Sequence, residues 1–482
     1  MFNFKIITRT LGFLLIGEGL LMVAALLVSL LYQEGDTIHF IHSALITIAT
    51  GVILFLFTRK ASPTIGKREG YIIVSIVWVL FSFFGSLPFI LSGSIPALHD
   101  AFFETMSGFT TTGASILDNI EELPHGILFW RSLIQWIGGM GIVVLSLAIL
   151  PAFGIGGISL YAAEAPGITT EKINPKIKDT AKILWNTYLV FTVVETIMLM
   201  FGGMSLFDSV CHSFTTMATG GFSTKQASVA YWNSPYIHYV ITAFTIIAAT
   251  NFSLTYFSFT GSPGKLFKNE EFKLFISIIL VFTLIITTGL LLTTDYSLEK
   301  AFRNSIFQVV TIISTTGYVT DDFMLWHPFL TYVLFLLFFV GGSTGSTSGS
   351  IKVMRIGLLL KNSYYELRRL IHPNAVIPVR FNNRAVNNQI INNVLAFFFF
   401  YIAVFFICSL IFMLFVDDYE TSIGAVASCL GNIGPGLGQV GPAFSYSQIP
   451  DAGKWFLSFI MLLGRLELFT VLVIFSPSFW RR

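Results

Sequence analysis

The chain has 482 residues, of which 54% are hydrophobic and only 11% are charged. A soluble protein of this length needs far more charge to cover its surface, so the composition indicates a polytopic membrane protein. The net charge of +2 argues against a broad basic surface for nucleic acid. Three scattered cysteines argue against a disulfide framework or a structural zinc site.

Ten segments are predicted to cross the membrane, because a spanning helix needs about 20 mostly apolar residues. Nine runs of suitable length lie near residues 11–31, 38–58, 71–91, 127–150, 183–203, 236–260, 274–292, 394–416 and 455–475. The tenth begins at 329–340, is interrupted by a segment of Gly, Ser and Thr at 341–350, and resumes at Ile351. This pattern predicts one span that is broken in the middle.

The distribution of Lys and Arg orients these spans. If the N-terminus is cytoplasmic, the loops on the cytoplasmic side hold 22 of the 28 basic residues. Every loop on that side then obeys the positive-inside rule, so both termini are expected in the cytoplasm. The longest cytoplasmic loop, about 352–388, carries seven basic residues and is a candidate site for anionic membrane lipid or for a soluble partner.

Four short segments of another kind lie between spans on the outer side, at 102–114, 207–221, 301–318 and 422–435. Each begins as a short, weakly apolar helix and ends in small residues around a glycine. The four endings are Thr111-Thr112-Gly113-Ala114, Ala218-Thr219-Gly220-Gly221, Thr315-Thr316-Gly317-Tyr318 and Asn432-Ile433-Gly434-Pro435. Aligned on Gly113, Gly220, Gly317 and Gly434, they recur at intervals of 107, 97 and 117 residues. A period near 100 residues, in phase with the spans, indicates four copies of one unit.

The chemistry of such a unit points to cations. A helix of about 10 residues covers about 15 Å, roughly half of the hydrocarbon core, so the chain must dip in and return. A non-helical return at membrane depth is tolerated only inside protein or along a water-filled path. Carbonyl oxygens from four such strands can replace the hydration shell of a cation. The alternative, Gly/Thr-rich surface turns, fits a single copy better than it fits four copies in phase.

These motifs resemble a known family. They read Phe-Thr-Thr-Thr-Gly-Ala at 109–114, Ala-Thr-Gly-Gly-Phe-Ser at 218–223, Ser-Thr-Thr-Gly-Tyr at 314–318 and Gly-Asn-Ile-Gly-Pro-Gly at 431–436. Over essentially the whole chain, the sequence resembles the Trk/Ktr/HKT superfamily of potassium transporters, and most of all its bacterial TrkH type. The resemblance implies an all-α polytopic membrane protein. Four pseudo-symmetric helix–pore-helix–helix repeats would surround one central pore, with two extra N-terminal transmembrane helices.

The same resemblance implies a selectivity filter whose carbonyls face the ion. Its residues would be Thr111, Thr112, Gly113, Ala218, Thr219, Gly220, Thr315, Thr316, Gly317, Asn432, Ile433 and Gly434. In the family a Ser in the first repeat goes with sodium permeation, so Gly113 favours potassium. Ala218 and Asn432 lack the hydroxyl of a Thr-x-Gly strand, which predicts an incomplete innermost site and looser selectivity than in a potassium channel.

The repeats also divide the chain. Residues 1–66 form the two N-terminal helices, and the four pore repeats occupy 67–160, 161–262, 263–370 and 371–482. The broken span belongs to the third repeat.

The break itself is a candidate gate. Polar, flexible backbone at mid-membrane must line a cavity, and broken helices commonly mark transport sites. The resemblance implies an intramembrane loop that closes the pore just below the filter; the alternative is a simple kink packed by neighbouring helices. Its residues are Gly341, Gly342, Ser343, Thr344, Gly345, Ser346, Thr347, Ser348, Gly349 and Ser350. They lack the spacing of a phosphate-binding loop, so no nucleotide is expected to bind this chain itself.

Arg465 lies about 14 residues into the last predicted span. A central Arg costs about 2.5–3.5 kcal/mol even on a lenient scale, so it must face water or a partner. We expect it to face the pore below the filter, to oppose cation passage and to hydrogen-bond the loop, a role that the resemblance also implies. The alternative is a structural Arg paired with a buried carboxylate such as Glu104 or Glu195.

Together these features predict potassium uptake across the bacterial inner membrane through a channel-like pore. The alternative is an alternating-access cation carrier coupled to protons or sodium. No grouping of His, Asp, Glu or Ser supports an enzyme, and no nucleic-acid partner is expected. The resemblance further implies a homodimer and a cytoplasmic regulatory subunit of the TrkA type, which would supply nucleotide binding in trans.

Overall fold

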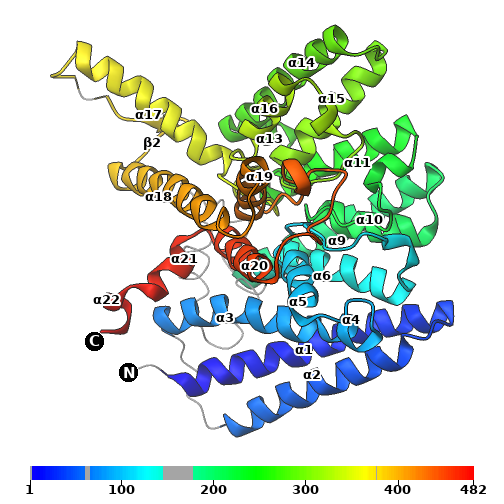
Figure 1. The fold of residues 1–482 in the computed structure, drawn as a ribbon. Coiled ribbons are helices and arrows are strands. Elements are labelled where there is room, and N and C mark those ends of the chain that lie inside the picture. The colour runs from blue at the N-terminus through cyan, green and yellow to red at the C-terminus, as the bar shows by residue number, and fades with distance from the viewer. Residues whose placement is uncertain (1–2, 60–65, 145–176, 376, 482) are drawn as a thin grey trace.

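The computed structural model describes residues 3–59, 66–144, 177–375 and 377–481, and these parts are almost entirely helical (Figure 1). The first two helices, α1 (Phe4–Tyr32) and α2 (Thr37–Phe57), lie side by side at one edge of the molecule. They approach closely at two glycines, since a Cβ on Gly12 or Gly51 would lie 2.7 Å from the carbonyl oxygen of the other. Small residues allow this kind of close packing between membrane helices.

The remaining helices follow the order expected of four repeats. The first repeat contains α3 (Lys67–Gly85), α4 (Leu87–Ser92), α5 (Leu98–Phe109) and α6 (His125–Val144). The second contains α9 (Ile177–Phe201), α10 (Leu206–Met217), α11 (Pro235–Ala248) and α12 (Phe252–Phe259). The third contains α13 (Pro263–Lys268), α14 (Glu270–Thr293), α15 (Leu298–Ile313), α16 (Pro328–Leu337) and α17 (Val353–Ile371). The fourth contains α18 (Asn388–Phe412), α19 (Tyr419–Gly431), α20 (Asp451–Arg465), α21 (Phe469–Leu472) and α22 (Pro477–Trp480).

Short 3-10 helices occur in the connections. They are η1 (Ile120–Glu122), η3 (Ser228–Tyr231), η4 (Phe323–Leu325), η5 (Gly438–Val440) and η6 (Val473–Phe475).

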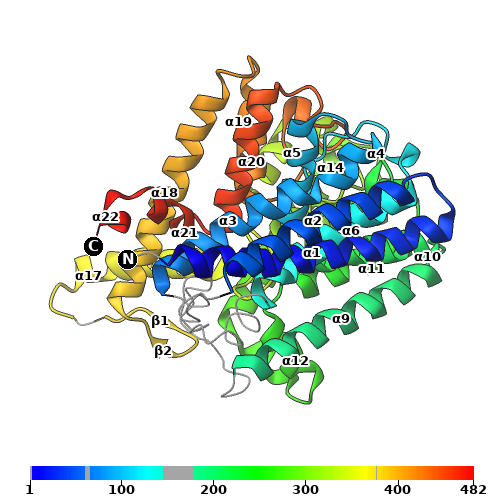
Figure 2. The same ribbon diagram turned by 90° about the horizontal axis from the view of Figure 1, so that it is seen from below.

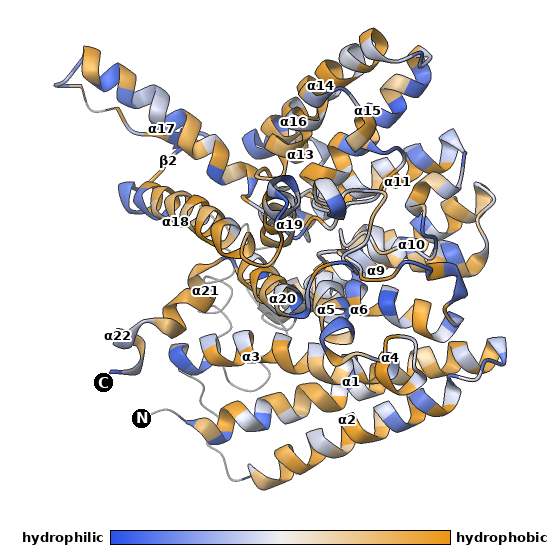
Figure 3. Ribbon diagram, in the orientation of Figure 1, coloured by the Kyte–Doolittle hydropathy of each residue, from blue (hydrophilic) through white to orange (hydrophobic). Residues whose placement is uncertain are grey.

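The helices are apolar enough to cross a membrane. Six of those described pass by length and composition, and eight pass if each of two bent pairs counts as one span. Large apolar side chains are exposed on the outer helices, and the hydropathy colouring follows this pattern (Figure 3); examples are Leu31, Phe57, Leu292 and Leu414. These features indicate a multi-pass membrane protein. Part of the predicted span 127–150 and the domain boundary at 160 lie outside the described residues.

Two of the spans predicted as continuous are bent, so that part of the prediction was wrong. The segment 236–260 divides into α11 and α12, which meet at 110°, and 455–475 divides after Arg465 with a bend of 108°. At the first bend the side chain of Asn251 caps α12 by accepting the N–H groups of Ser253 and Leu254. At the second bend Glu467 and Leu468 have positive φ.

The segment predicted as a cytoplasmic loop at 352–388 is also more ordered than expected. It contains α17, followed by an antiparallel hairpin of β1 (Arg380–Phe381) and β2 (Arg384–Ala385). Asn382 and Asn383 form the turn with φ of 48° and 61°, a conformation that Asn tolerates. The two ends of the described chain lie close together in both ribbon views, as expected if both are on one side of the membrane (Figures 1 and 2).

Candidate functional site

The four pore helices α5, α10, α15 and α19 end in the same way. The residue after each helix cap has a left-handed conformation, with φ of 52° at Thr111, 53° at Thr219, 59° at Thr315 and 55° at Asn432. The next N–H bonds the carbonyl five residues back in every copy: Thr112 to Ser107, Gly220 to Thr215 and Thr316 to Thr311 at 2.8 Å, and Ile433 to Ser428 at 3.0 Å. This is the Schellman cap. Its four copies identify Thr111, Thr219, Thr315 and Asn432 as equivalent positions.

A second left-handed residue follows two positions later in each copy, and it is always glycine. The φ values are 80° at Gly113, 78° at Gly221, 75° at Gly317 and 104° at Gly434. We call 111–113, 219–221, 315–317 and 432–434 return segments one to four.

The predicted alignment of the second copy on Gly220 was therefore wrong by one residue. Gly221 is the counterpart of Gly113, and Gly220 is the counterpart of Thr112, so the glycine intervals become 108, 96 and 117 residues. Thr219 supplies the hydroxyl that the second segment had seemed to lack, and Ala218 lies one position before it, at the helix cap. Of the four segments, only the fourth departs from Thr at the left-handed position, where it has Asn432.

The return segments form a closed ring. A Cβ on Gly113 would collide with the carbonyl oxygen of Gly220, one on Gly221 with that of Thr316, and one on Gly317 with that of Ile433. The ring closes between the fourth and first segments, where a Cβ on Gly434 would lie 2.8 Å from the Thr112 carbonyl oxygen. The same four glycines line a cavity of about 90 Å³. Glycine is needed at these four positions both for the positive φ and for this close approach.

The left-handed threonines carry strain. A β-branched residue rarely adopts positive φ, and a residue held there costs of order 1–3 kcal/mol. Glycine could adopt the same conformation without that cost but would bring no hydroxyl group. Because three of the four positions hold Thr and the fourth holds Asn, we infer that the polar side chains at the inner end of the ring are used.

The segment 341–350, the intramembrane loop, lies directly against the inner end of the ring. The Gly349 N–H donates to Thr315 Oγ1 at 2.7 Å, and Thr219 Oγ1 donates to Thr347 Oγ1 at 3.2 Å. A Cβ on Gly349 would lie 3.1 Å from Cβ of Asn432. The loop therefore contacts the left-handed residues of return segments two, three and four.

Neighbouring helices hold the outer side of this loop. The Ser343 N–H donates to the Ala249 carbonyl at 2.8 Å, at the bend between α11 and α12. Asn251 Nδ2 donates to the Thr344 carbonyl at 2.7 Å, and the Thr344 N–H donates to Glu271 Oε1 at 2.6 Å. The polar backbone of the loop is thus satisfied by protein groups at membrane depth, as burial there requires.

Arg465 is the last residue of α20 and touches the loop, as predicted. Its Nη1 donates to the Thr347 carbonyl at 2.9 Å, and its Nη2 donates to the Gly138 carbonyl of α6 at 2.9 Å. Glu467 pairs with Arg355 of α17. The side chain of Arg465 thus links the loop to the first repeat, on the other side of the ring.

Comparison with known proteins matches residues 37–482 to the family described as TrkH, cation transport protein. The chain belongs to the TrkH family. The Trk system potassium uptake protein TrkH of Salmonella typhimurium is 42% identical over 484 residues, which cover 99% of this chain and 100% of that protein. TrkG of Escherichia coli is 34% identical and covers 99% of each chain. The crystal structure of the potassium transporter TrkH from Vibrio parahaemolyticus matches with a TM-score of 0.90 and 38% identity over 100% of both chains. The predicted family and the all-α membrane fold are confirmed.

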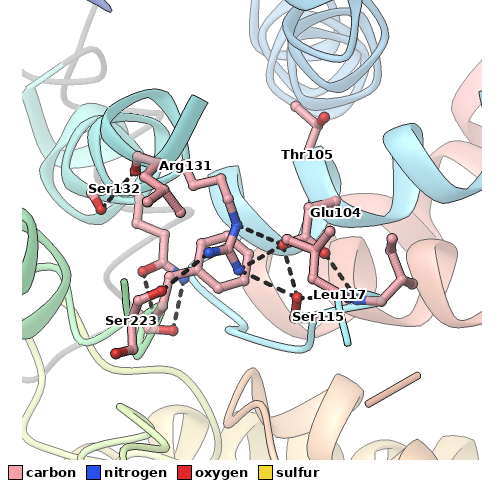
Figure 4. Close-up of polar contacts among 12 residues, drawn as sticks. Glu104, Thr105, Ser115, Leu117, Arg131, Ser132 and Ser223 are labelled. Atoms are coloured by element: carbon pink, nitrogen blue, oxygen red, sulfur yellow. Dashed lines mark hydrogen bonds and ion pairs between the residues drawn. The ribbon is translucent and has the colours of Figure 1, made fainter. Parts of the chain in front are cut away.

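This TrkH-family chain also contains a buried ion pair that the sequence analysis missed (Figure 4). Arg131 of α6 bonds Glu104 of pore helix α5 at 2.8 and 2.9 Å, and neither side chain is more than 2% exposed. Glu104 also accepts the Ile116 N–H at 3.0 Å, and Arg131 donates to the Ser223 carbonyl at 3.1 Å. The pair therefore braces the chain just beyond the first two return segments. Glu104 is committed to Arg131, so the alternative pairing of Glu104 with Arg465 was wrong.

A second brace in the TrkH fold starts from Tyr318, directly after the third return segment. Its hydroxyl donates to the His212 carbonyl at 3.1 Å and also bonds the hydroxyl of Thr215. Both partners lie on α10, the pore helix of the second repeat. Each of these braces connects neighbouring repeats, which holds the ring as one unit.

Proposed function

We propose that the protein conducts potassium inward across the bacterial inner membrane through a pore on the axis of the four return segments. The closed ring from Gly113 to Gly434 is the observation that carries this proposal. The TrkH relatives from Salmonella typhimurium and Escherichia coli are named potassium uptake proteins, which supports potassium as the transported ion.

Carbonyl oxygens of the ring would take the place of the water around a dehydrated cation. The partly negative C-termini of all four pore helices end at the ring, and they favour a positive charge there. With the corrected alignment, the proposed filter comprises Thr111, Thr112, Gly113, Thr219, Gly220, Gly221, Thr315, Thr316, Gly317, Asn432, Ile433 and Gly434. Gly113 in the first segment favours potassium over sodium.

The intramembrane loop and Arg465 form the proposed gate. The loop lies against three of the four inner positions, and the Arg465 guanidinium adds a positive charge that opposes a cation. Opening would require the loop to leave Thr315 and the Arg465–Thr347 bond to break. This arrangement describes a closed pore.

Control of that gate is proposed to come from outside the chain. The relatives are named as members of a Trk system, which supports an associated component, and we propose a cytoplasmic nucleotide-binding subunit of the TrkA type. The basic segment at α17 and the hairpin is the proposed contact for this subunit or for anionic lipid. We also propose that the protein is a homodimer with both termini in the cytoplasm.

The deciding experiment is cation flux into liposomes that hold the purified chain, with potassium compared against sodium for wild type and Gly113→Ser. Flux that favours potassium in wild type and loses that preference in the variant is the expected result. Equal flux of both ions in both proteins would overturn the filter assignment. Single-channel currents distinguish the pore from a coupled carrier, which gives only slow, saturable flux.

A further inference from the structure

The amide of Gln135 on α6 is bonded to the second return segment. Its Nε2 donates to the Gly220 carbonyl oxygen at 2.7 Å, and its Oε1 accepts the Phe222 N–H at 3.1 Å. The side chain is fully buried. One amide therefore fixes two backbone groups on either side of Gly221.

Gly220 is a glycine because of this contact. The equivalent positions in the other segments hold Thr112, Thr316 and Ile433, and Gly220 does not have a positive φ. Its backbone conformation therefore does not call for glycine. The space does, because a Cβ on Gly220 would lie 2.5 Å from Cδ of Gln135. The missing side chain at 220 and the amide at 135 form a matched pair.

This contact is not repeated around the ring. Gly138 of α6 and Gly464 of α20 each press against the carbonyl two residues before the left-handed position of their own repeat, at Phe109 and Leu430. This equivalence places Met461 at the position of Gln135. Methionine has no amide, so the α20 counterpart cannot hold a neighbouring carbonyl in this way.

The second segment needs such a hold more than the others do. It contains Gly220-Gly221, and a peptide unit flanked by two glycines can rotate at little steric cost. The corresponding pairs in the other segments are Thr112-Gly113, Thr316-Gly317 and Ile433-Gly434, each with one residue that restricts rotation. The bonds from Gln135 to the Gly220 carbonyl and to the Phe222 N–H oppose such a rotation from both ends.

We propose that Gln135 is a positioning residue that fixes the Gly220 carbonyl in the ring and thereby sets the ion preference of the pore. The proposal rests on the proposed filter and goes beyond it by making one of the four ring positions chemically distinct. Selectivity depends on how many carbonyl dipoles a filter keeps on the ion and on their strength. A carbonyl that rotates away removes one of four ligands from potassium.

The first test is Gln135→Met, which keeps the approximate volume but loses both hydrogen bonds. We expect the ratio of potassium to sodium flux in liposomes to fall by about fivefold, the factor that corresponds to the loss of about one hydrogen bond. The matched control is Gln308→Met on α15, where another fully buried glutamine donates to the Asp321 carbonyl at 3.3 Å, outside the ring. It removes a similar bond, and the flux ratio should stay at the wild-type value. An unchanged ratio in folded Gln135→Met protein overturns the proposal.

The second test measures the matched pair without any flux. Gly220→Ala should lower the yield and melting temperature of the purified protein in the wild-type background, because the new Cβ meets the Gln135 amide. In the Gln135→Ala background the same change should cost little. Equal losses in both backgrounds would contradict the pairing, and this comparison remains decisive if Gln135→Met does not fold.

Gly113→Ser is measured in parallel to separate the two levels of the argument. If Gly113→Ser alters selectivity and Gln135→Met does not, the role of Gln135 is wrong and the proposed filter stands. If neither variant alters the selectivity of a folded protein, the filter assignment itself is wrong.

Discussion

Arg465 donates a hydrogen bond of 2.9 Å from its guanidinium to the carbonyl oxygen of Thr347, at the centre of the intramembrane loop. The same side chain bonds Gly138 on the first repeat, so one residue connects two walls of the pore. Its position at the C-terminus of α20 is favourable for a positive charge, because helix C-termini are partly negative. The bond therefore depends on the α20 helix ending at this residue.

Replacing Arg465 with Ala should speed cation flux. The change removes both the bond to the loop and the charge that a passing cation meets, and each ~1.4 kcal/mol taken from a barrier raises a rate about tenfold. We expect at least about tenfold faster flux in liposomes under the same criterion. Arg465→Lys retains the charge and is the control, which should remain slow. Folded Arg465→Ala protein with wild-type flux would exclude a gating role.

The corrected alignment makes a separate prediction for the second return segment. Gly221→Ser should reduce the preference for potassium as Gly113→Ser does, because both glycines have positive φ and both face a neighbouring carbonyl. Ala218→Ser serves as the control, since Ala218 lies at the helix cap and precedes the ring. The ratio of potassium to sodium flux distinguishes the two alignments. A change in Ala218→Ser without one in Gly221→Ser would restore the original alignment.

Breaking the buried pair of Glu104 and Arg131 should strongly destabilise the fold. Glu104→Gln leaves the Arg131 charge buried without its partner, a change that typically costs about 3–5 kcal/mol. Thermal unfolding in detergent should show this loss, and the double variant Glu104→Gln with Arg131→Met should recover part of it. Glu299→Gln is the matched control, because the Glu299–Arg303 pair at 2.9 Å has a Glu side chain that is 52% exposed. An exposed pair contributes about 0–1 kcal/mol, so equal losses at both sites would contradict the argument.

The fourth pore helix should depend on pH through its N-cap. Asp418 accepts the Thr421 N–H at 2.9 Å, and hydrogen bonds from the Thr421 hydroxyl and N–H lower the pKa of the Asp418 carboxyl below its ordinary value. The folded pKa is the lower one, so the stabilisation is complete above the unfolded pKa of about 3.9 and is lost as the pH falls through the folded value.

Asp418→Ala should therefore cost about 1 kcal/mol near neutral pH. Melting temperatures measured from pH 7 down to pH 3 should converge for the variant and the wild type at the acidic end. A constant difference over this range would show that the carboxylate charge does not support the cap.

The four copies of the pore segment could be predicted from the sequence, because each one carries its own glycine and its own flanking spans. The alignment of the second copy could not. Gly220 and Gly221 are adjacent, and only the backbone conformation identifies Gly221 as the left-handed residue. The reason for a glycine at 220 lies in Gln135, which is 85 residues away in the chain.

The bends after α11 and α20 escaped prediction for a related reason. Sequence signals for helix ends depend on Gly, Pro and capping residues, and the segments Ala249-Thr250-Asn251 and Leu466-Glu467-Leu468 contain neither Gly nor Pro. The bends are held instead by tertiary contacts, from the intramembrane loop at Ala249 and from Arg355 at Glu467. The Glu104–Arg131 pair likewise depends on how α5 and α6 pack, which spacing alone does not give.

The contact between the first and last return segments has a consequence for biosynthesis. Asn432 Nδ2 donates to Thr112 Oγ1 at 2.9 Å across a separation of 320 residues. A chain made from its N-terminus places Thr112 in the membrane long before Asn432 has been translated. The ring can therefore close only after the fourth repeat has been inserted, together with α20 and its arginine. The cell acquires the conducting path and the residue that blocks it at the same step, and an unfinished chain has no complete ring through which to lose ions.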